Sequence, residues 1–221
     1  MAPLDRWKHE ATAFDRVLFF SDAVFAIAVT LLVLPLADVQ LAPTHVGSQL
    51  VGLIPQMLTF ALSFIVTGLF WMSHHKWFQL VSAFDTRSLW VNMIFLLCVA
   101  FLPFPTSVLA QRGDTSAATA FYAGAIAMTG VLACTLWWYM SRHRELLTSD
   151  GAPALLHRHF LSSLAAPIVF ALSIPLSYGD ASLAKYSWIL TYPVSRLIQG
   201  VTRRERQRPP AGTDRRNDSA A

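Results

Sequence analysis

The sequence predicts an all-α integral membrane protein with six transmembrane helices per subunit. Hydrophobic residues make up 54% of the 221 residues and charged residues only 14%, whereas a soluble domain carries about 25% charged residues. The hydrophobic residues gather into runs of the length that crosses a bilayer, about 20 residues. Lysines and arginines lie between these runs in an alternating pattern, as in multi-pass membrane proteins.

Six apolar runs predict the individual helices. They cover residues 17–36, 50–73, 89–110, 116–140, 160–178 and 183–201. Pro103 and Pro105 near the end of the third run predict a kinked helix end. The sixth run is interrupted by Pro193 and contains Lys185 and Arg196. These two cations lie near its ends, where long side chains can reach the membrane interface.

The basic residues predict the orientation. Fifteen of the seventeen lysines and arginines lie before helix 1, between helices 2 and 3, between helices 4 and 5, or at the end of helix 6 and after it. The positive-inside rule therefore predicts that both termini are cytoplasmic. Residues 1–13 are the expected cytoplasmic N-terminus, 14–201 the transmembrane domain and 202–221 a disordered basic tail. Since the basic residues lie in loops and in the tail, the net charge of +4 does not indicate a nucleic-acid partner.

The motifs of common enzyme classes are missing from the sequence. It has no Gly-rich phosphate loop, no His-x-x-x-His zinc spacing and no Gly-x-Ser-x-Gly elbow. It also lacks the Thr-Val-Gly-Tyr-Gly filter of ordinary potassium channels. Cys98 and Cys134 lie inside apolar runs, where thiols serve mainly in packing. We therefore expect no enzyme, no cofactor and no bound metal.

Helix 1 carries one acid, Asp22, inside its apolar run. Placing a carboxylate in hydrocarbon costs several kcal/mol, so such a residue usually has a hydrogen-bonding or charged partner or a functional role. With about 100° between successive residues, a stripe of uncharged side chains shares one helix face, and Asp22 lies about 140° from its centre. The stripe consists of Ile27, Thr30, Leu31 and Leu34. If the stripe lines a pore, Asp22 faces its own helix bundle; if Asp22 lines an aqueous path, the stripe is ordinary packing.

Several polar side chains lie at a depth similar to that of Asp22. An indole N–H, an amide and an imidazole can each donate a hydrogen bond to a carboxylate. The candidates for a network with Asp22 are Ser21, Trp71, His74 or His75, and Asn92. The two adjacent histidines diverge by about 100° on a helix, which argues against a shared metal. Arg16 either bends toward Asp22, faces a pore mouth, or acts as a positive-inside anchor.

The motif Arg16-x-x-x-Phe20-Ser21-Asp22, continuing after Ala23 as Val-Phe-Ala-Ile-Ala-Val-Thr-Leu-Leu, resembles the signature of the transmembrane protein 175 family. The Trp-Met-Ser-His-His sequence from Trp71 and the Phe-Leu-Pro-Phe-Pro-Thr sequence after Asn92 also fit. The resemblance covers about residues 14–200. It implies a potassium-permeable channel of the prokaryotic, single-repeat form, in the cell membrane. It further implies a homotetramer with helix 1 lining a central pore.

The resemblance implies a role for each face of helix 1. Ile27 is the expected narrowest apolar ring, Thr30 supplies hydroxyls to the passing ion, and Leu31 and Leu34 continue the constriction. Transient K⁺ is expected near Ile27 and Thr30. The Phe-Ser-Asp motif belongs to the network that holds helix 1 against its neighbours.

The hypothesis is therefore passive potassium conduction through apolar rings that gate by dewetting or rotation. Asp38 is a candidate for attracting cations at the outer mouth. The alternative is a proton-coupled secondary transporter that uses Asp22 and His74 or His75 as a relay.

Overall fold

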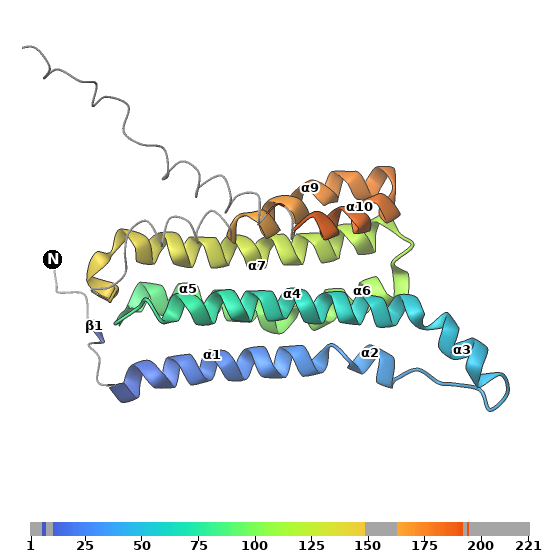
Figure 1. Cartoon of the computed structure of the whole chain (residues 1–221), viewed down its shortest axis with the longest axis horizontal. Coiled ribbons are helices and arrows are strands. Elements are labelled where there is room, and N and C mark those ends of the chain that lie inside the picture. Colours follow the sequence, from blue (N-terminus) through green and yellow to red (C-terminus); the bar gives the residue numbers. More distant parts are fainter. Residues whose placement is uncertain (1–5, 8–10, 149–162, 192–193, 195–221) are drawn as a thin grey trace, which may run out of the picture.

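The computed structural model describes residues 6–7, 11–148, 163–191 and 194. The predicted basic tail at 202–221 and most of the predicted N-terminal segment lie outside the described residues. The described chain forms a bundle of long helices that run side by side (Figure 1). The principal helices are α1 (Ala11–Leu31), α4 (Ile54–Phe78), α5 (Thr86–Phe101), α6 (Pro103–Arg112), α7 (Ser116–Arg142) and α9 (Ala165–Gly179).

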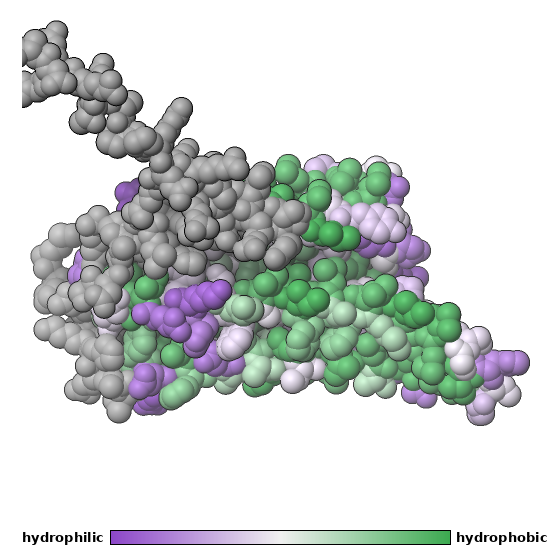
Figure 2. Space-filling view, in the orientation of Figure 1, coloured by the Kyte–Doolittle hydropathy of each residue, from purple (hydrophilic) through white to green (hydrophobic). Residues whose placement is uncertain are grey.

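The helices are stacked in layers. Helix α1 lies at one edge and packs against α4 and α5, while α7 packs against α5, α6 and α9 on the other side (Figure 1). Arg16 and Arg87 lie near the starts of α1 and α5, and Lys76 and Arg142 lie at the ends of α4 and α7, so we call this the basic end. Figure 2 shows hydrophobic residues over the middle of the visible described surface and hydrophilic residues toward its ends, as expected for a membrane protein.

Four described segments are long and apolar enough to cross a bilayer. They are Phe14–Ala37, Ile54–Phe78, Thr86–Arg112 and Ser116–Arg142. The first four predicted spans are thus confirmed as helical segments. The fifth is described only as α9, which has 15 residues, because its predicted start lies outside the described residues. The sixth is described as α10 (Ala181–Ser187) and a 3-10 turn at Trp188–Leu190. The count of six helices stays a prediction.

Prolines divide three of the spans. The first span ends its long helix at Leu31 and resumes as α2 (Leu34–Ala37), which has Pro35 in its first turn. The same arrangement separates α3 (Val46–Gly52) from α4, and α5 from α6. Proline has no backbone N–H and clashes with the preceding turn, so it is accommodated best where a helix begins. The first span therefore contains a break after Leu31, and Leu34 lies on α2.

A small non-helical cap closes the basic end. Strand β1 (Arg6–Trp7) pairs antiparallel with β2 (Phe84–Asp85), which the all-α prediction missed because two-residue strands have no readable periodicity. Asp85 caps α5 by accepting from the Ser88 backbone at 2.9 Å, and the Tyr139 hydroxyl also donates to it. Burial raises the pKa of Asp85, but the hydrogen bonds from Ser88 and Tyr139 outweigh it, so the pKa lies below its usual value. This stabilisation is present above the ordinary pKa and is lost as the pH falls through the lowered one.

Candidate functional site

The structure divides α1 into a buried and an exposed face. Ser21, Phe25, Ala28 and Leu32 are buried at a spacing of four, three and four residues, which is one helical face. Ile27 lies on the opposite side and is 59% exposed. The other members of the predicted stripe are also exposed: Thr30, Leu31 and, on α2, Leu34. The chain's own helices therefore leave this stripe uncovered.

Thr30 is the one hydroxyl in the uncovered stripe. Its Oγ1 donates to the backbone carbonyl of Ile27 at 2.8 Å. The hydroxyl hydrogen is therefore used in a hydrogen bond to the helix backbone. The lone pairs of Oγ1 remain available and could contact a cation.

A buried hydrogen-bond network joins three helices. Asn92 of α5 donates from Nδ2 to Ser21 Oγ of α1 at 3.2 Å, and its Oδ1 lies 3.1 Å from Nε2 of His74 on α4. The Ser21 hydroxyl donates a hydrogen bond to the carbonyl oxygen of Val17 at 2.9 Å. All three side chains are at most 1% exposed. Because Asn92 Oδ1 can only accept, His74 Nε2 carries the hydrogen in this arrangement.

Aromatic rings enclose His74. The Phe78 ring stacks on it at a centroid distance of 4.0 Å, and the Phe95 ring stacks at 5.6 Å. Among the described residues, Nδ1 of His74 has no hydrogen-bond partner. The imidazole is thus held by one hydrogen bond and by ring packing.

Asp22 belongs to a separate contact at the edge of the bundle. Its Oδ1 accepts from the indole nitrogen of Trp71 on α4 at 2.9 Å. The Trp71 ring in turn stacks on His75 at 5.6 Å, and Nε2 of His75 lies 3.2 Å from Nε2 of Gln79. The sequence predicted one hydrogen-bond network, but the structure has two. His74 belongs to the buried network, and His75 stacks on Trp71 in the outer one.

Two residues of the motif stand apart from both networks. Phe20 is 49% exposed, and Arg16 is exposed near the start of α1. In the described structure no hydrogen bond or ion pair joins the Arg16 side chain to Asp22. The motif spacing thus presents Arg16 and Phe20 outward while Ser21 turns in.

A second buried polar cluster was missed by the sequence analysis. Tyr122 of α7 is fully buried, and its hydroxyl accepts from Ser63 Oγ of α4 at 3.0 Å. Thr106 of α6 lies with its Oγ1 3.1 Å from Ser63 Oγ and 2.8 Å from the carbonyl of Leu102. Polar residues inside apolar runs were the available signal, but their pairing depends on how the helices pack.

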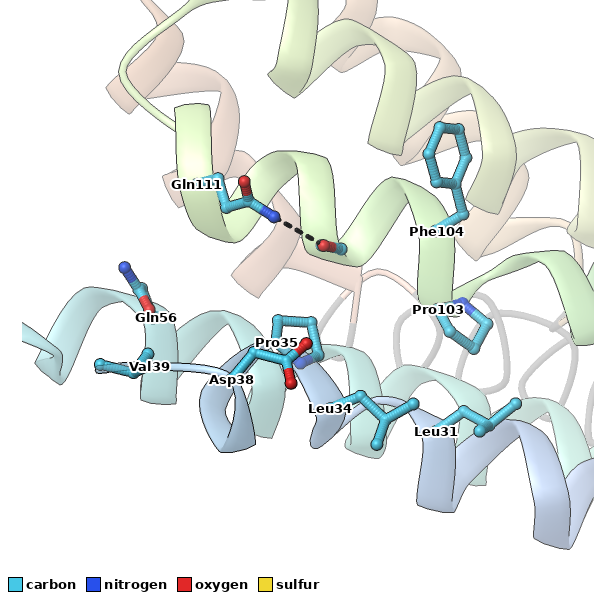
Figure 3. A pocket seen from close by; sticks show the side chains of 10 residues that line it. Leu31, Leu34, Pro35, Asp38, Val39, Gln56, Pro103, Phe104 and Gln111 are labelled. Carbon is cyan, nitrogen blue, oxygen red and sulfur yellow. Dashed lines mark hydrogen bonds between the residues drawn. The ribbon is translucent and has the colours of Figure 1, made fainter. Parts of the chain in front are cut away.

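A pocket of about 510 Å³ opens at the end of the bundle opposite the basic end (Figure 3). Asp38 points from the end of α2 into the space below α6 (Figure 3). Leu31 and Leu34 line the same pocket, so the acid lies at the end of the uncovered stripe. On the α6 side, Gln111 donates to Ser107 Oγ at 2.9 Å.

No described group of three or more His, Cys, Asp or Glu side chains could hold a metal ion. Cys98 and Cys134 are both free thiols.

Comparison with known proteins assigns the family. The model of the family described as endosomal/lysosomal potassium channel TMEM175 matches residues 16–103. A Streptomyces collinus protein named as a potassium channel is 34% identical over 183 residues, which cover 76% of this chain and 87% of that protein. The chain belongs to the TMEM175 family.

Two further TMEM175 proteins show the range of the relationship. The crystal structure titled as a lysosomal potassium-selective channel TMEM175 homolog from Chamaesiphon minutus superposes with a TM-score of 0.70 at 26% identity, over 86% of this chain and 98% of that one. The human protein, named endosomal/lysosomal proton channel TMEM175, is 24% identical over 178 residues, which cover 74% of this chain and 35% of the human one.

Membership of the TMEM175 family confirms three predictions. The family resemblance was correct, the chain is a multi-pass membrane protein of a potassium-channel family, and it is no enzyme, since TMEM175 proteins are ion channels. The residues matched by the family model include most of α1 and all of α4 and α5, and thus both hydrogen-bond networks.

Replacing Asn92 by Leu is expected to destabilise this TMEM175 chain by roughly 1–2 kcal/mol, because the buried Nε2 of His74 loses its acceptor. Thermal unfolding of the purified protein in detergent measures the loss. The double variant Asn92→Leu with His74→Phe should recover part of it, since both polar partners are then gone. Equal losses in the single and double variants would contradict the role of this hydrogen bond.

Proposed function

We propose that this chain is one subunit of a potassium-permeable channel that conducts passively through a constriction formed by α1. The observation that carries the proposal is the uncovered stripe of α1, which lies opposite the face that packs on α4 and α5. In a family of potassium channels, a helix with one packed face and one uncovered, largely apolar face is suited to line a pore.

The proposed assembly is a homotetramer with α1 of each subunit at the central axis. A groove of about 690 Å³ between α1 and α4 supports self-association. Asp22 and Trp71 lie on this groove, and Asp22 is costly to leave against lipid. Gly68, on α4, also lines the groove, and a Cβ added there would meet nothing within 4 Å. A small residue beside open space suits close approach by a neighbouring helix.

Within the proposed pore, Ile27 forms the narrowest apolar ring and acts as the gate. An apolar ring stops ions when it loses its water, and it opens when it widens or rotates aside. Thr30 supplies acceptor oxygens that replace part of the water around K⁺, while Leu31 and Leu34 extend the constriction. Asp38, at the end of the stripe, attracts cations to the mouth. The proposed setting is a prokaryotic cell membrane, with both termini in the cytoplasm and six helices per subunit.

A second candidate is proton transport, which the name of the human relative favours. The candidate relay was Asp22 with His74 or His75. Asp22 is bonded to Trp71, and His74 is bonded to Asn92, in two separate hydrogen-bond networks. A relay between Asp22 and His74 therefore needs water or a rearrangement. His75 is separated from Asp22 by the Trp71 indole, which stacks on it and offers no titratable group. Both arrangements make passive potassium conduction the better-supported function.

Purified protein in planar bilayers under a potassium gradient tests the proposal. We expect discrete single-channel currents that reverse near the equilibrium potential of K⁺ and shrink when Na⁺ replaces K⁺. Protein-free bilayers prepared with the same detergent are the control. A silent bilayer together with a saturable, pH-driven flux in vesicles would instead establish the transporter.

A further inference from the structure

An open groove runs along α7 on the side that faces α9. It has a volume of about 410 Å³ and is lined mainly by apolar side chains. From α7 the lining residues are Val131, Cys134, Thr135 and Trp138, and from α9 or just before it Leu164, Pro167, Ile168 and Ala171. The α7 residues recur at spacings of three and four, so they form one helical stripe.

The two helices meet closely beside this groove. A Cβ added at Gly130 of α7 would lie 2.9 Å from Cδ of Pro167, so only glycine allows this approach. The groove floor is therefore set by the contact between Gly130 and the Pro167 ring, and side chains such as Ile168, which is 49% exposed, form its walls. A groove built on such a contact is already formed before anything binds it.

A cation lies at one end of the stripe. Arg142 is four residues beyond Trp138, and its guanidinium carbon lies 5.3 Å from the centre of the Trp138 ring. From Val131 to Arg142 the helix rises about 16 Å, close to the half-thickness of the hydrocarbon core, about 15 Å. Trp138 is 49% exposed, as expected for an indole at the membrane interface. Glu145, three residues further, is the nearest described acid in the sequence.

We propose that the groove between α7 and α9 binds one anionic phospholipid, with an acyl chain along the stripe and its phosphate on Arg142. The apolar stripe matches the length of an acyl chain within one leaflet, and the arginine lies at headgroup level. Guanidinium is well suited to phosphate because it donates in a fixed, forked geometry. The location at the basic end places the lipid in the leaflet that carries the other cations, Arg16, Lys76 and Arg87. Binding at this site is independent of conduction.

Native mass spectrometry of the purified protein in detergent tests this site. Phosphatidylglycerol and phosphatidylcholine with identical acyl chains are added in turn, and retained lipids are counted. We expect phosphatidylglycerol to be favoured by roughly fivefold, the contribution of one arginine beside a lipid of net negative charge, because the choline of phosphatidylcholine offsets its phosphate. Arg142→Gln should abolish this preference. Arg112→Gln, an exposed cation outside the groove, should preserve it.

A second set of variants tests the groove itself. Ala171→Phe adds a ring at an exposed groove position and should lower retention of both lipids. If this variant does not fold, Thr135→Phe fills the same groove from α7. An unchanged lipid preference in Arg142→Gln would overturn the proposal. So would a change of oligomeric mass in Ala171→Phe with lipid retention intact, because it would make the groove a contact between subunits.

Discussion

Substituting Ile27 by Asn is expected to raise the potassium current about tenfold, which corresponds to a barrier lowered by about 1.4 kcal/mol. In the proposed pore, four copies of this side chain form an apolar ring that water leaves readily. An amide at the same position holds water and offers oxygen to the ion, so the dewetted state loses its advantage. The substitution should spare the subunit fold, because Ile27 is 59% exposed and takes no part in the buried core.

The matched control is Ile94→Asn. Ile94 lies on α5 and is also exposed, at 46%, but it lies outside the α1 stripe. Single-channel recording in planar bilayers compares the two variants with the unmodified protein. We also expect Ile27→Asn to reduce the discrimination of K⁺ over Na⁺, and Ile94→Asn to leave it unchanged. Currents that are identical in all three proteins would remove Ile27 from the conduction path.

Substituting Gly68 by Phe is expected to shift the protein from tetramers to smaller species. The phenyl ring would fill the groove between α1 and α4 where the neighbouring subunit is proposed to pack. Inside one subunit the change is tolerated, since a Cβ at Gly68 meets nothing within 4 Å. Molar mass measured by light scattering in detergent reports the assembly, and circular dichroism checks that the helices are retained.

Gly124→Phe is the control for this experiment. Gly124 lies on α7, also with open space around its Cβ position, and it does not line the α1–α4 groove. It should therefore leave the molar mass unchanged. A tetramer that persists in Gly68→Phe would show that the subunits meet elsewhere, and the proposed placement of α1 at the axis would need revision.

Local patterns predicted much of the fold and of α1. Apolar run lengths located the first four spans, and the period of the helix placed Ile27 and Ser21 on different faces. Both signals depend only on residues close together in the chain. Run length alone did not locate the break after Leu31, where Pro35 lies in the first turn of a separate short helix that carries Leu34.

Other features depend on residues far apart in the chain. Ser21 and Asn92 are 71 positions apart, and Asp22 and Trp71 are 49 apart, so their pairing follows from how α1, α4 and α5 pack. The sequence predicted one hydrogen-bond network for these polar residues, whereas the packing of the helices divides them between two networks. The β1–β2 pair and the Ser63–Thr106–Tyr122 cluster likewise required the packed helices.

By itself, the sequence determined that this chain is a helical membrane protein and that Asp22 and an uncharged stripe lie on different faces of the first helix. Hydrophobicity and helical period are sufficient for that, because both are properties of a single segment. The TMEM175 family followed from the motif between Arg16 and Asp22 and from the similarity to its relatives. The tertiary structure alone decided which partner each buried polar group finds and which grooves stay open. These depend on the relative positions of whole helices, and a small residue such as Gly130 sets how closely another helix can approach.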